Sequence, residues 1–188
     1  EENQRYWSPT PGPVPGQDSY EVSHGFGYTR YEHTSYSLKS ELLQFVPKDD
    51  EIKISRLKIS NKSNEKRQIS LFSYHEWVLG INREDSAPFI IQEADQNSDV
   101  IYARNHYNNE FSDRVAVVSC MGVSKEGSEV SFTTDRQFFI GRNRSLEKPE
   151  AIIDRRKLNE EVKTGGDPCA AFQIELVLEP GEEIECNI

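Results

Sequence analysis

One stretch decides the fold: Ile52-Lys53-Ile54-Ser55-Arg56-Leu57-Lys58-Ile59, then the polar cluster Asn61-Lys62-Ser63-Asn64-Glu65-Lys66, then residues 69–79 with the sequence ISLFSYHEWVL. The first segment places apolar side chains at nearly every second position, which is the period of a β-strand with one buried face. The polar cluster carries turn residues, and the third segment is rich in aromatic and apolar residues. The pattern predicts two strands joined as a hairpin through the polar cluster.

Strand-like segments continue on both sides of this stretch. They cover residues 20–24, 26–33, 35–45, 99–104, 114–120, 130–134, 170–178 and 183–188, with turn signals at 46–50, 125–127 and 179–181. Helix signals are limited to a single turn over residues 135–140 and a short helix over 149–156. Many strands with few short helices predict an all-β fold, a two-sheet antiparallel sandwich.

The first 19 residues differ in composition from the rest of the chain. The segment Trp7-Ser8-Pro9-Thr10-Pro11-Gly12-Pro13-Val14-Pro15-Gly16 is too rich in Pro and Gly for a helix or strand, so residues 1–19 are expected to form an extended arm. Residues 20–188 are of a length that suits one domain. The chain begins at Glu1 and ends within an alternating strand pattern, which predicts a fragment of a larger chain.

Charge and cysteine content limit the classes of partner. The chain has 22 Lys and Arg against 32 Asp and Glu, a net charge of −10, which disfavours nucleic acid and anionic membrane surfaces. Its longest apolar runs are far shorter than the ~20 residues of a transmembrane helix, so direct membrane contact is not expected. Three cysteines without a C-x-x-C pair argue against a disulfide framework and a zinc ribbon, and they indicate a reducing, cytoplasmic compartment.

Catalytic and metal motifs are not recognisable in the sequence. His75-Glu76 lacks the second histidine of H-E-x-x-H. His24 and His33 could lie on adjacent strands, but hydrogen-bonded sheet positions account for them more simply than a metal site. No Gly-rich phosphate loop or G-x-S-x-G is present, and no base adjoins Cys169. We therefore expect no catalytic residues, no metal and no cofactor in this chain.

Residues 134–143 hold the densest mixture of guanidinium, carboxylate and aromatic groups in the chain. Arg136, Phe139, Arg142 and Asn143 are the candidates for contact with a carbohydrate or with another domain. Arginines near carboxylates form forked hydrogen bonds that can anchor a loop or an interface, and the same groups can bind a sugar or phosphate. The sequence leaves both interpretations open.

Aromatic residues are the second group of carbohydrate-contact candidates, because the C–H faces of pyranose rings are apolar. Tyr28 and Tyr107 are candidates of this kind. Core packing is the favoured interpretation for Trp77, and contact with a neighbouring surface is favoured for Trp7.

Several short motifs together resemble one known family. They are Trp7-Ser8-Pro9-Thr10, His24-Gly25-Phe26-Gly27-Tyr28-Thr29, Glu76-Trp77-Val78-Leu79-Gly80, Ala103-Arg104-Asn105-His106-Tyr107-Asn108, Thr134-Asp135-Arg136 with Phe139-Ile140-Gly141-Arg142-Asn143, and Asp167-Pro168-Cys169-Ala170. In this order they resemble the β-sandwich domain of the cellobiose and chitobiose phosphorylase family, glycoside hydrolase family ninety-four. The resemblance is greatest to the version in cyclic β-1,2-glucan synthases and covers nearly the whole chain.

The resemblance implies a galactose-mutarotase-like super-sandwich that supports a catalytic domain without carrying its groups. In this family the sandwich precedes a helical linker and an (α/α)6 barrel, and the barrel supplies the general acid and the phosphate-binding groups. The implied partners are that linker and barrel, a β-glucan or oligosaccharide near the active site, and a second copy in a homodimer. The implied location is the cytoplasmic face of the bacterial inner membrane, within a larger glycosyltransferase. The alternative is a self-sufficient carbohydrate-binding module.

Overall fold

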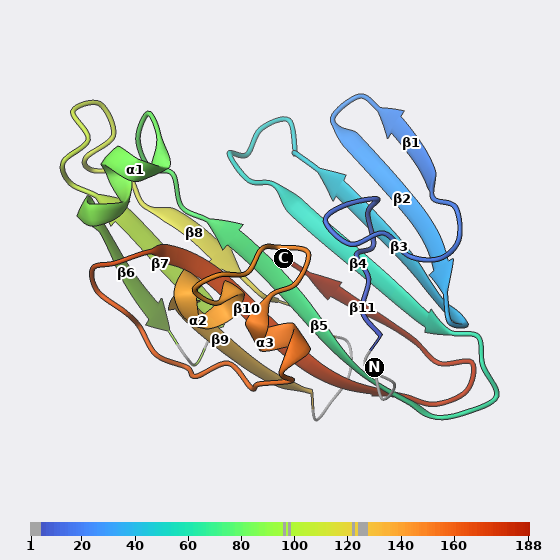
Figure 1. The fold of residues 1–188 in the computed structure, drawn as a ribbon. Coiled ribbons are helices and arrows are strands. Elements are labelled where there is room, and N and C mark those ends of the chain that lie inside the picture. The colour runs from blue at the N-terminus through green and yellow to red at the C-terminus, as the bar shows by residue number, and fades with distance from the viewer. Residues whose placement is uncertain (1–4, 96, 98, 122, 124–127) are drawn as a thin grey trace. The chain divides into compact units, whose positions relative to one another are not determined.

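The computed structural model describes residues 5–95, 97, 99–121, 123 and 128–188, and it is built mainly of strands (Figure 1). The strands form three antiparallel sheets. Helix within the described residues is limited to α1 (Arg83–Ser86), the 3-10 turn η1 (Ala87–Phe89), α2 (Arg136–Ile140) and α3 (Glu150–Ile153). The predicted all-β class with few short helices is confirmed. The predicted turn at 125–127 lies outside the described residues.

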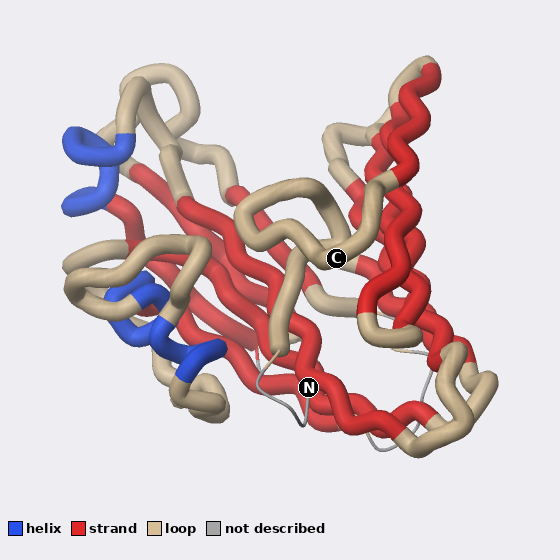
Figure 2. The backbone as a smooth tube through the Cα atoms, turned by 45° about the vertical axis from the view of Figure 1, so that its right-hand side comes forward, coloured by secondary structure: helices blue, strands red, loops and turns tan. Residues whose placement is uncertain are grey.

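Backbone contacts divide the chain into two compact units, each assembled from separate segments. Unit 1 consists of Glu1–Ser70, Met121–Ser128 and Glu175–Ile188, and unit 2 consists of Leu71–Cys120 and Glu129–Ile174. Helices α1, α2 and α3 all belong to unit 2, with α1 apart from the pair α2 and α3 (Figure 2). The single domain expected over residues 20–188 stays a prediction. No helix among the described residues has the length and apolar character needed to cross a bilayer.

Unit 1 contains one five-stranded antiparallel sheet. Its strands follow the order β1 (Glu21–Gly25), β2 (Tyr28–Ser35), β3 (Leu38–Phe45), β4 (Ile54–Asn61) and β11 (Glu183–Asn187). Strands β2 and β3 are joined by Tyr36-Ser37, whose φ angles of 51° and 62° give the primed turn that matches the twist of a tight hairpin. The sequence segment 35–45, predicted as one strand, therefore begins with a turn.

The predicted hairpin between residues 52–59 and 69–79 is wrong. Strand β4 is bonded to β3 along one edge and to β11 along the other, with Ile59 opposite Ser40 on one side and Ile184 on the other. Both edges of β4 are thus occupied. Asn61, expected in the hairpin turn, is instead fully buried, and its amide nitrogen lies 3.1 Å from the carbonyl oxygens of Leu178 and Glu179.

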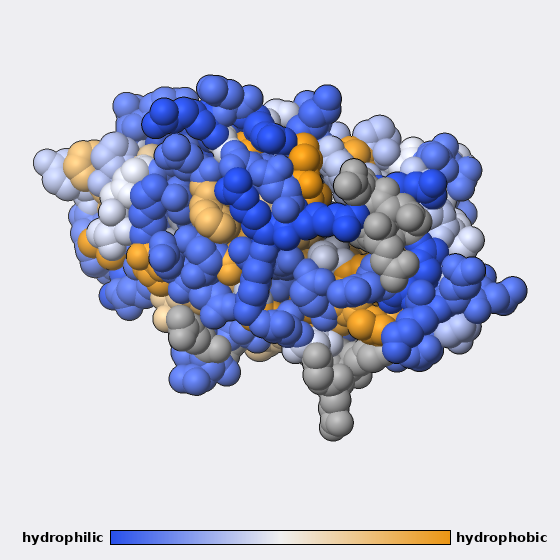
Figure 3. Space-filling view, turned by 60° about the horizontal axis from the view of Figure 1, so that its bottom comes forward, coloured by the Kyte–Doolittle hydropathy of each residue, from blue (hydrophilic) through white to orange (hydrophobic). Residues whose placement is uncertain are grey.

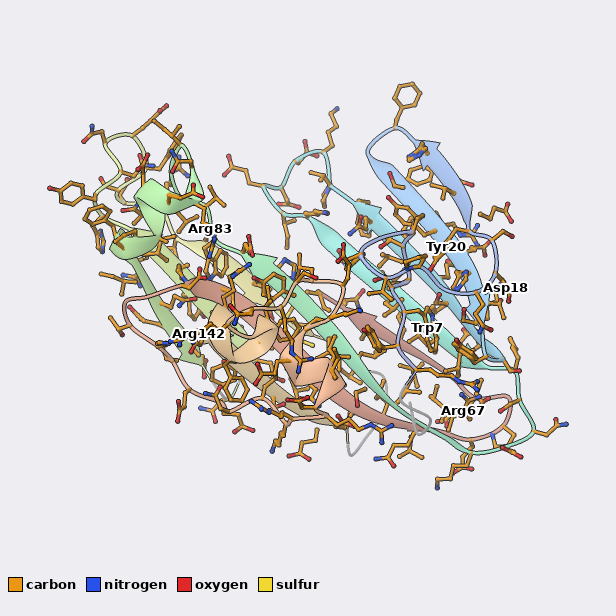
Figure 4. All side chains as sticks on the ribbon, in the orientation of Figure 1. Trp7, Asp18, Tyr20, Arg67, Arg83 and Arg142 are labelled. Atoms are coloured by element: carbon orange, nitrogen blue, oxygen red, sulfur yellow. The ribbon has the colours of Figure 1, made fainter. Side chains whose placement is uncertain are left out.

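The arm is ordered along unit 1. Tyr20 stacks on buried His33 with ring centroids 3.9 Å apart, and the Tyr20 hydroxyl donates to the Ser8 carbonyl while accepting the Gly16 N–H. Gly16 lies so close to His33 that a Cβ at this glycine would be 2.0 Å from Nε2. Trp7 packs on Tyr36 of the same unit with ring centroids 5.5 Å apart. Figure 4 labels Trp7 in the arm and Tyr20 directly after it. The predicted extended arm is a fixed part of the fold from residue 5 onward.

Two three-stranded sheets complete the structure. One has the order β6 (Ile90–Asp95), β7 (Val100–Asn105), β8 (Ala116–Ser119), and the other has the order β5 (Arg67–Glu76), β10 (Pro168–Leu178), β9 (Glu129–Asp135). Strand β6 was not predicted from the sequence. Strand β10 is the most deeply buried, with only two intermediate positions among its residues, and both β5 and β10 contribute residues to each unit.

A hydrophobic cluster in unit 2 fixes the position of α2. Its buried members are Phe139, Ile140, Ala151, Leu158 and Ala171, with Phe72, Tyr74, Phe138 and Ile152 packed against them. Elsewhere, apolar side chains on the surface lie in small separate patches among hydrophilic ones, as on the face drawn in Figure 3. The cluster therefore holds α2 and α3 on unit 2 through burial of apolar side chains.

Candidate functional site

Four charged side chains of unit 2 form an ion cluster, defined as Glu76, Arg83, Arg136 and Asp167. Arg136 donates from Nε to Glu76 Oε1 at 2.8 Å and from its terminal nitrogen to Asp167 Oδ2 at 3.3 Å. Arg83 pairs with Asp167 and lies 3.9 Å from Glu76. The backbone N–H of Arg136 also donates to the Asp167 carbonyl at 3.1 Å. Two guanidinium groups and two carboxylates thus balance each other in charge.

The ion cluster stabilises its carboxylates in the ionised form. Partial burial acts to raise the pKa of Glu76, but hydrogen bonds from Arg136 and Tyr74 outweigh it and leave that pKa below its usual value. Burial, reinforced by the hydrogen bond to Glu76, raises the pKa of the Tyr74 phenol far above its usual range. Tyr74 therefore stays protonated and donates to Glu76 Oε1 at 2.7 Å. Glu76 is a structural anion here and is poorly suited to act as a general acid.

Helix α2 is anchored at its start and along its buried face. Asp135 caps the helix by accepting the Gln137 N–H at 2.9 Å, and its carboxylate is paired with Lys163 at 2.7 Å. Phe139 is 2% exposed and stacks on Tyr74 with centroids 4.9 Å apart. Gly141 then ends the helix with φ of 92°, a conformation that suits glycine. These contacts anchor the helix, which in turn supports the residues that follow it.

Arg142 and Asn143 are exposed and follow helix α2. Both lie directly after Gly141, on the stretch that connects α2 to α3, and Figure 4 labels Arg142 beside α2. Of the four candidates in this segment, Arg136 and Phe139 thus have internal partners, while Arg142 and Asn143 face solvent. A guanidinium and a carboxamide at this position can donate several hydrogen bonds to the hydroxyl groups of a sugar or to another domain.

The aromatic candidates lie on different parts of the chain. Tyr28 begins β2 in unit 1, is 45% exposed and covers Gly25. Tyr107 lies in unit 2, in the loop after β7, and stacks on Phe89. Trp77 is buried and donates its indole N–H to Gln92 at 2.9 Å, as the core interpretation predicts.

The cysteine thiols are buried, and the imidazoles of His24 and His33 form hydrogen bonds within the chain. All three cysteines are buried and carry reduced thiols, and burial raises the pKa of Cys169 well above its usual range and that of Cys186 to about 11. His24 shares a hydrogen bond with Thr29, and buried His33 contacts Ser35 and the Ser19 carbonyl. Among the residues that the structure describes, no group of three or more His, Cys, Asp or Glu side chains could hold a metal ion.

Sequence reasoning missed three members of the ion cluster, because only Arg136 was a candidate. Glu76 and Asp167 open two of the short motifs given above, and Arg136 ends a third, so the structure brings these three motifs together. The signal available in the sequence was the charged residue that each of these three motifs carries. Their sequence separations of 60 and 31 residues hid the pairing.

Comparison with known proteins supplies the family context. The family model for the glycosyl hydrolase 94 supersandwich domain matches residues 1–188. A cyclic beta-(1,2)-glucan synthase, NdvB, of Rhizobium meliloti (strain 1021) is 32% identical over 164 residues, which are 87% of this chain and 6% of that protein.

Two phosphorylases are more distant relatives. A solabiose phosphorylase of Paenibacillus borealis is 26% identical over 189 residues, covering 97% of this chain and 24% of that protein. An N,N'-diacetylchitobiose phosphorylase of Vibrio furnissii is 24% identical over 169 residues, covering 88% of this chain and 20% of that protein. The chain therefore spans only a small fraction, at most about a quarter, of the relatives it matches.

Proposed function

This chain belongs to the glycosyl hydrolase 94 supersandwich family, and we propose that it is a non-catalytic domain that supports a catalytic (α/α)6 barrel in a longer carbohydrate-active protein. The observation that carries the proposal is the family match over all 188 residues, combined with relatives that are at least four times longer than the matched segment. The names of those relatives, a glucan synthase and a phosphorylase, support the proposal that the parent is a glycosyltransferase or a glycoside phosphorylase.

The chemistry of the described residues supports a non-catalytic role. The carboxylates of the ion cluster are neutralised by arginines, and the thiol of Cys169 is buried and held protonated by its raised pKa. Acid–base or nucleophilic catalysis needs groups whose pKa values are matched to proton transfer or attack, within reach of a substrate. Burial raises the pKa of Asp99, which lies in the turn before β7 and whose backbone carbonyl accepts the Cys120 N–H at 3.0 Å.

The loop after α2 is proposed to be the surface through which the domain contacts the barrel or an oligosaccharide. Arg136 and Phe139 would position this loop from within unit 2, and Arg142 and Asn143 would contact the barrel or an oligosaccharide at its active-site mouth. A guanidinium fits this role because it is always charged and donates in a fixed fork. These different roles follow from exposure. Of the four candidates, Arg136 belongs to the ion cluster and Phe139 to the hydrophobic cluster, whereas Arg142 and Asn143 are exposed.

The test is substitution in the full-length protein. Arg142→Ala and Asn143→Ala, alone and together, should lower kcat/KM for phosphorolysis or shift the size of the glucan product, with an unchanged Tm. Arg144→Ala is the matched control and should leave activity and product size unchanged, because Arg144 is a neighbouring exposed arginine that is paired with Asp154 at 3.8 Å. Unchanged activity, product size and assembly in the double variant would refute the assignment of this loop.

A second experiment tests the non-catalytic role. The 188-residue chain, incubated alone with a β-1,2-linked glucan and inorganic phosphate, should release no glucose 1-phosphate. Release above the level of a heat-denatured sample would overturn the proposal. The proposal also includes a location at the cytoplasmic face of the inner membrane within the parent, and a homodimer of that parent, which fractionation and light scattering of the full-length protein would test.

A further inference from the structure

Two aromatic rings of unit 2 form an exposed stacked pair, which we call the Phe89–Tyr107 platform. Phe89 ends η1 and Tyr107 lies in the loop after β7, with ring centroids 4.4 Å apart and planes inclined by 14°. Tyr107 is 76% exposed and Phe89 is 43% exposed. One face of the Tyr107 ring meets Phe89, so its exposure leaves the other face open to solvent. Tyrosine is enriched at binding interfaces because its ring has an apolar face and a polar hydroxyl.

The loop that carries Tyr107 is fixed by hydrogen bonds before any ligand binds. The buried amide of Asn105 accepts the Tyr107 N–H at 3.0 Å and donates to the Leu79 carbonyl at 2.7 Å. Asn108 accepts the N–H groups of Glu110 and Phe111 at 2.9 and 3.0 Å. Binding on this surface would thus cost little conformational entropy, because the loop is already ordered.

Charge around the platform selects against anionic ligands. Helix α1, directly before η1, carries exposed Glu84 and Asp85 besides Arg83, which is paired with Asp167. The Tyr107 loop carries exposed Glu110 and Asp113 against Arg114. The chain as a whole has a net charge of −10. Phosphodiesters and anionic lipid headgroups are repelled by such surroundings. A neutral ligand with an apolar face suits the platform better.

We propose that the Phe89–Tyr107 platform binds the pyranose rings of a neutral oligosaccharide. The apolar C–H face of a sugar ring would stack on the open face of Tyr107, and neighbouring amide and carboxylate groups would accept or donate hydrogen bonds to its hydroxyls. The site does not use the loop after α2 and does not depend on a barrel. It would retain a glucan chain on the domain itself.

The test is a 1H–15N NMR titration of the 188-residue chain with a linear β-1,2-linked glucose oligomer and, in parallel, with a β-1,4-linked one. Shifts confined to residues 87–91 and 105–111 are expected with at least one of the two, and the pair of titrations identifies the preferred linkage. Tyr107→Ala should weaken binding about tenfold, the loss of one aromatic stacking contact. The exposure of Tyr107 means that the fold should persist, which the unchanged remainder of the spectrum would verify.

Phe26→Ala is the matched control, because Phe26 is also an exposed aromatic residue but lies in unit 1, and this variant should bind as the wild type does. The absence of platform shifts with both oligomers would overturn the proposal. So would shifts of the same residues that depend on protein concentration alone, since they would identify the platform as a contact between copies of the chain. Equal weakening by Phe26→Ala and Tyr107→Ala would also contradict the assignment.

Discussion

Replacing Arg136 with alanine tests whether this residue anchors α2 internally. The substitution removes the bonds to Glu76 at 2.8 Å and to Asp167 at 3.3 Å, leaving two carboxylates to share Arg83. Hydrogen bonds to charged groups contribute about 1.5–3 kcal/mol when buried, whereas exposed ion pairs contribute about 0.2–1 kcal/mol. The Arg136 side chain is 28% exposed. An intermediate loss of about 1–2 kcal/mol is expected, which corresponds to a Tm lower by about 2–8 °C.

Urea denaturation of the 188-residue chain, followed by tryptophan fluorescence, measures this loss. A double-mutant cycle with Glu76→Gln separates the pairwise coupling from the cost of truncating a long side chain, and we expect a coupling of ~1 kcal/mol. Arg142→Ala is the control, since Arg142 is exposed and should leave the unfolding midpoint unchanged. If Arg136→Ala leaves stability within ~0.3 kcal/mol of wild type while lowering activity of the full-length protein, internal anchoring is refuted and direct ligand contact is favoured.

Three further predictions concern the pH dependence, the arm and the thiols. The pKa of Glu76 is lower in the folded chain than in the unfolded chain, so its contribution to stability is complete above the unfolded pKa of ~4.3 and is lost as the pH falls through the lower folded value. Glu76→Gln should therefore make the urea midpoint fall less steeply as the pH drops below ~4.3. The same steepness in the variant and the wild type would contradict the assignment. Gly16→Ala should detach the arm, because the new Cβ would lie 2.0 Å from His33 Nε2. Gly12→Ala is the control, because a Cβ there meets no atom within 4 Å. Limited proteolysis should cleave the arm faster in the Gly16 variant than in the wild type and should not do so in the Gly12 variant. Cys169 is buried and its pKa is raised, so in the native chain it should react with a thiol-specific disulfide reagent far more slowly than in the urea-unfolded chain, and similar rates would argue against the burial.

The local period of the sequence predicted most strands but not their partners. Alternation identifies a strand because neighbouring side chains point to opposite faces, and this property is local. The polar cluster after β4 suggested that β4 pairs with the next strand along the chain, β5. The structure instead pairs β4 with β11, which lies far away in the sequence. The tight turn at Tyr36-Ser37 was missed for a different reason. Neither residue is Gly, Asn or Asp, which are the usual signals of a positive φ.

The candidate site was predicted only in part. The segment around α2 was correctly singled out as a short helical turn with a concentration of charged and aromatic groups. Its division into buried and exposed members depends on tertiary packing, since Phe139 is covered by Tyr74 and Phe72 from a distant strand. The exposed Phe89–Tyr107 platform depends likewise on two segments that meet only in the folded chain.

The pairing of β4 with β11 has a consequence for biosynthesis. Asn61 and Leu178, which are hydrogen bonded in unit 1, are 117 residues apart, and β11 follows later still. At translation speeds of about 5–20 residues per second, the edge of β4 waits roughly 6–24 s for its partner. An unpaired strand edge is a template for association with other chains during that interval. The edge of β4 is therefore open to such association until β11 has been synthesised.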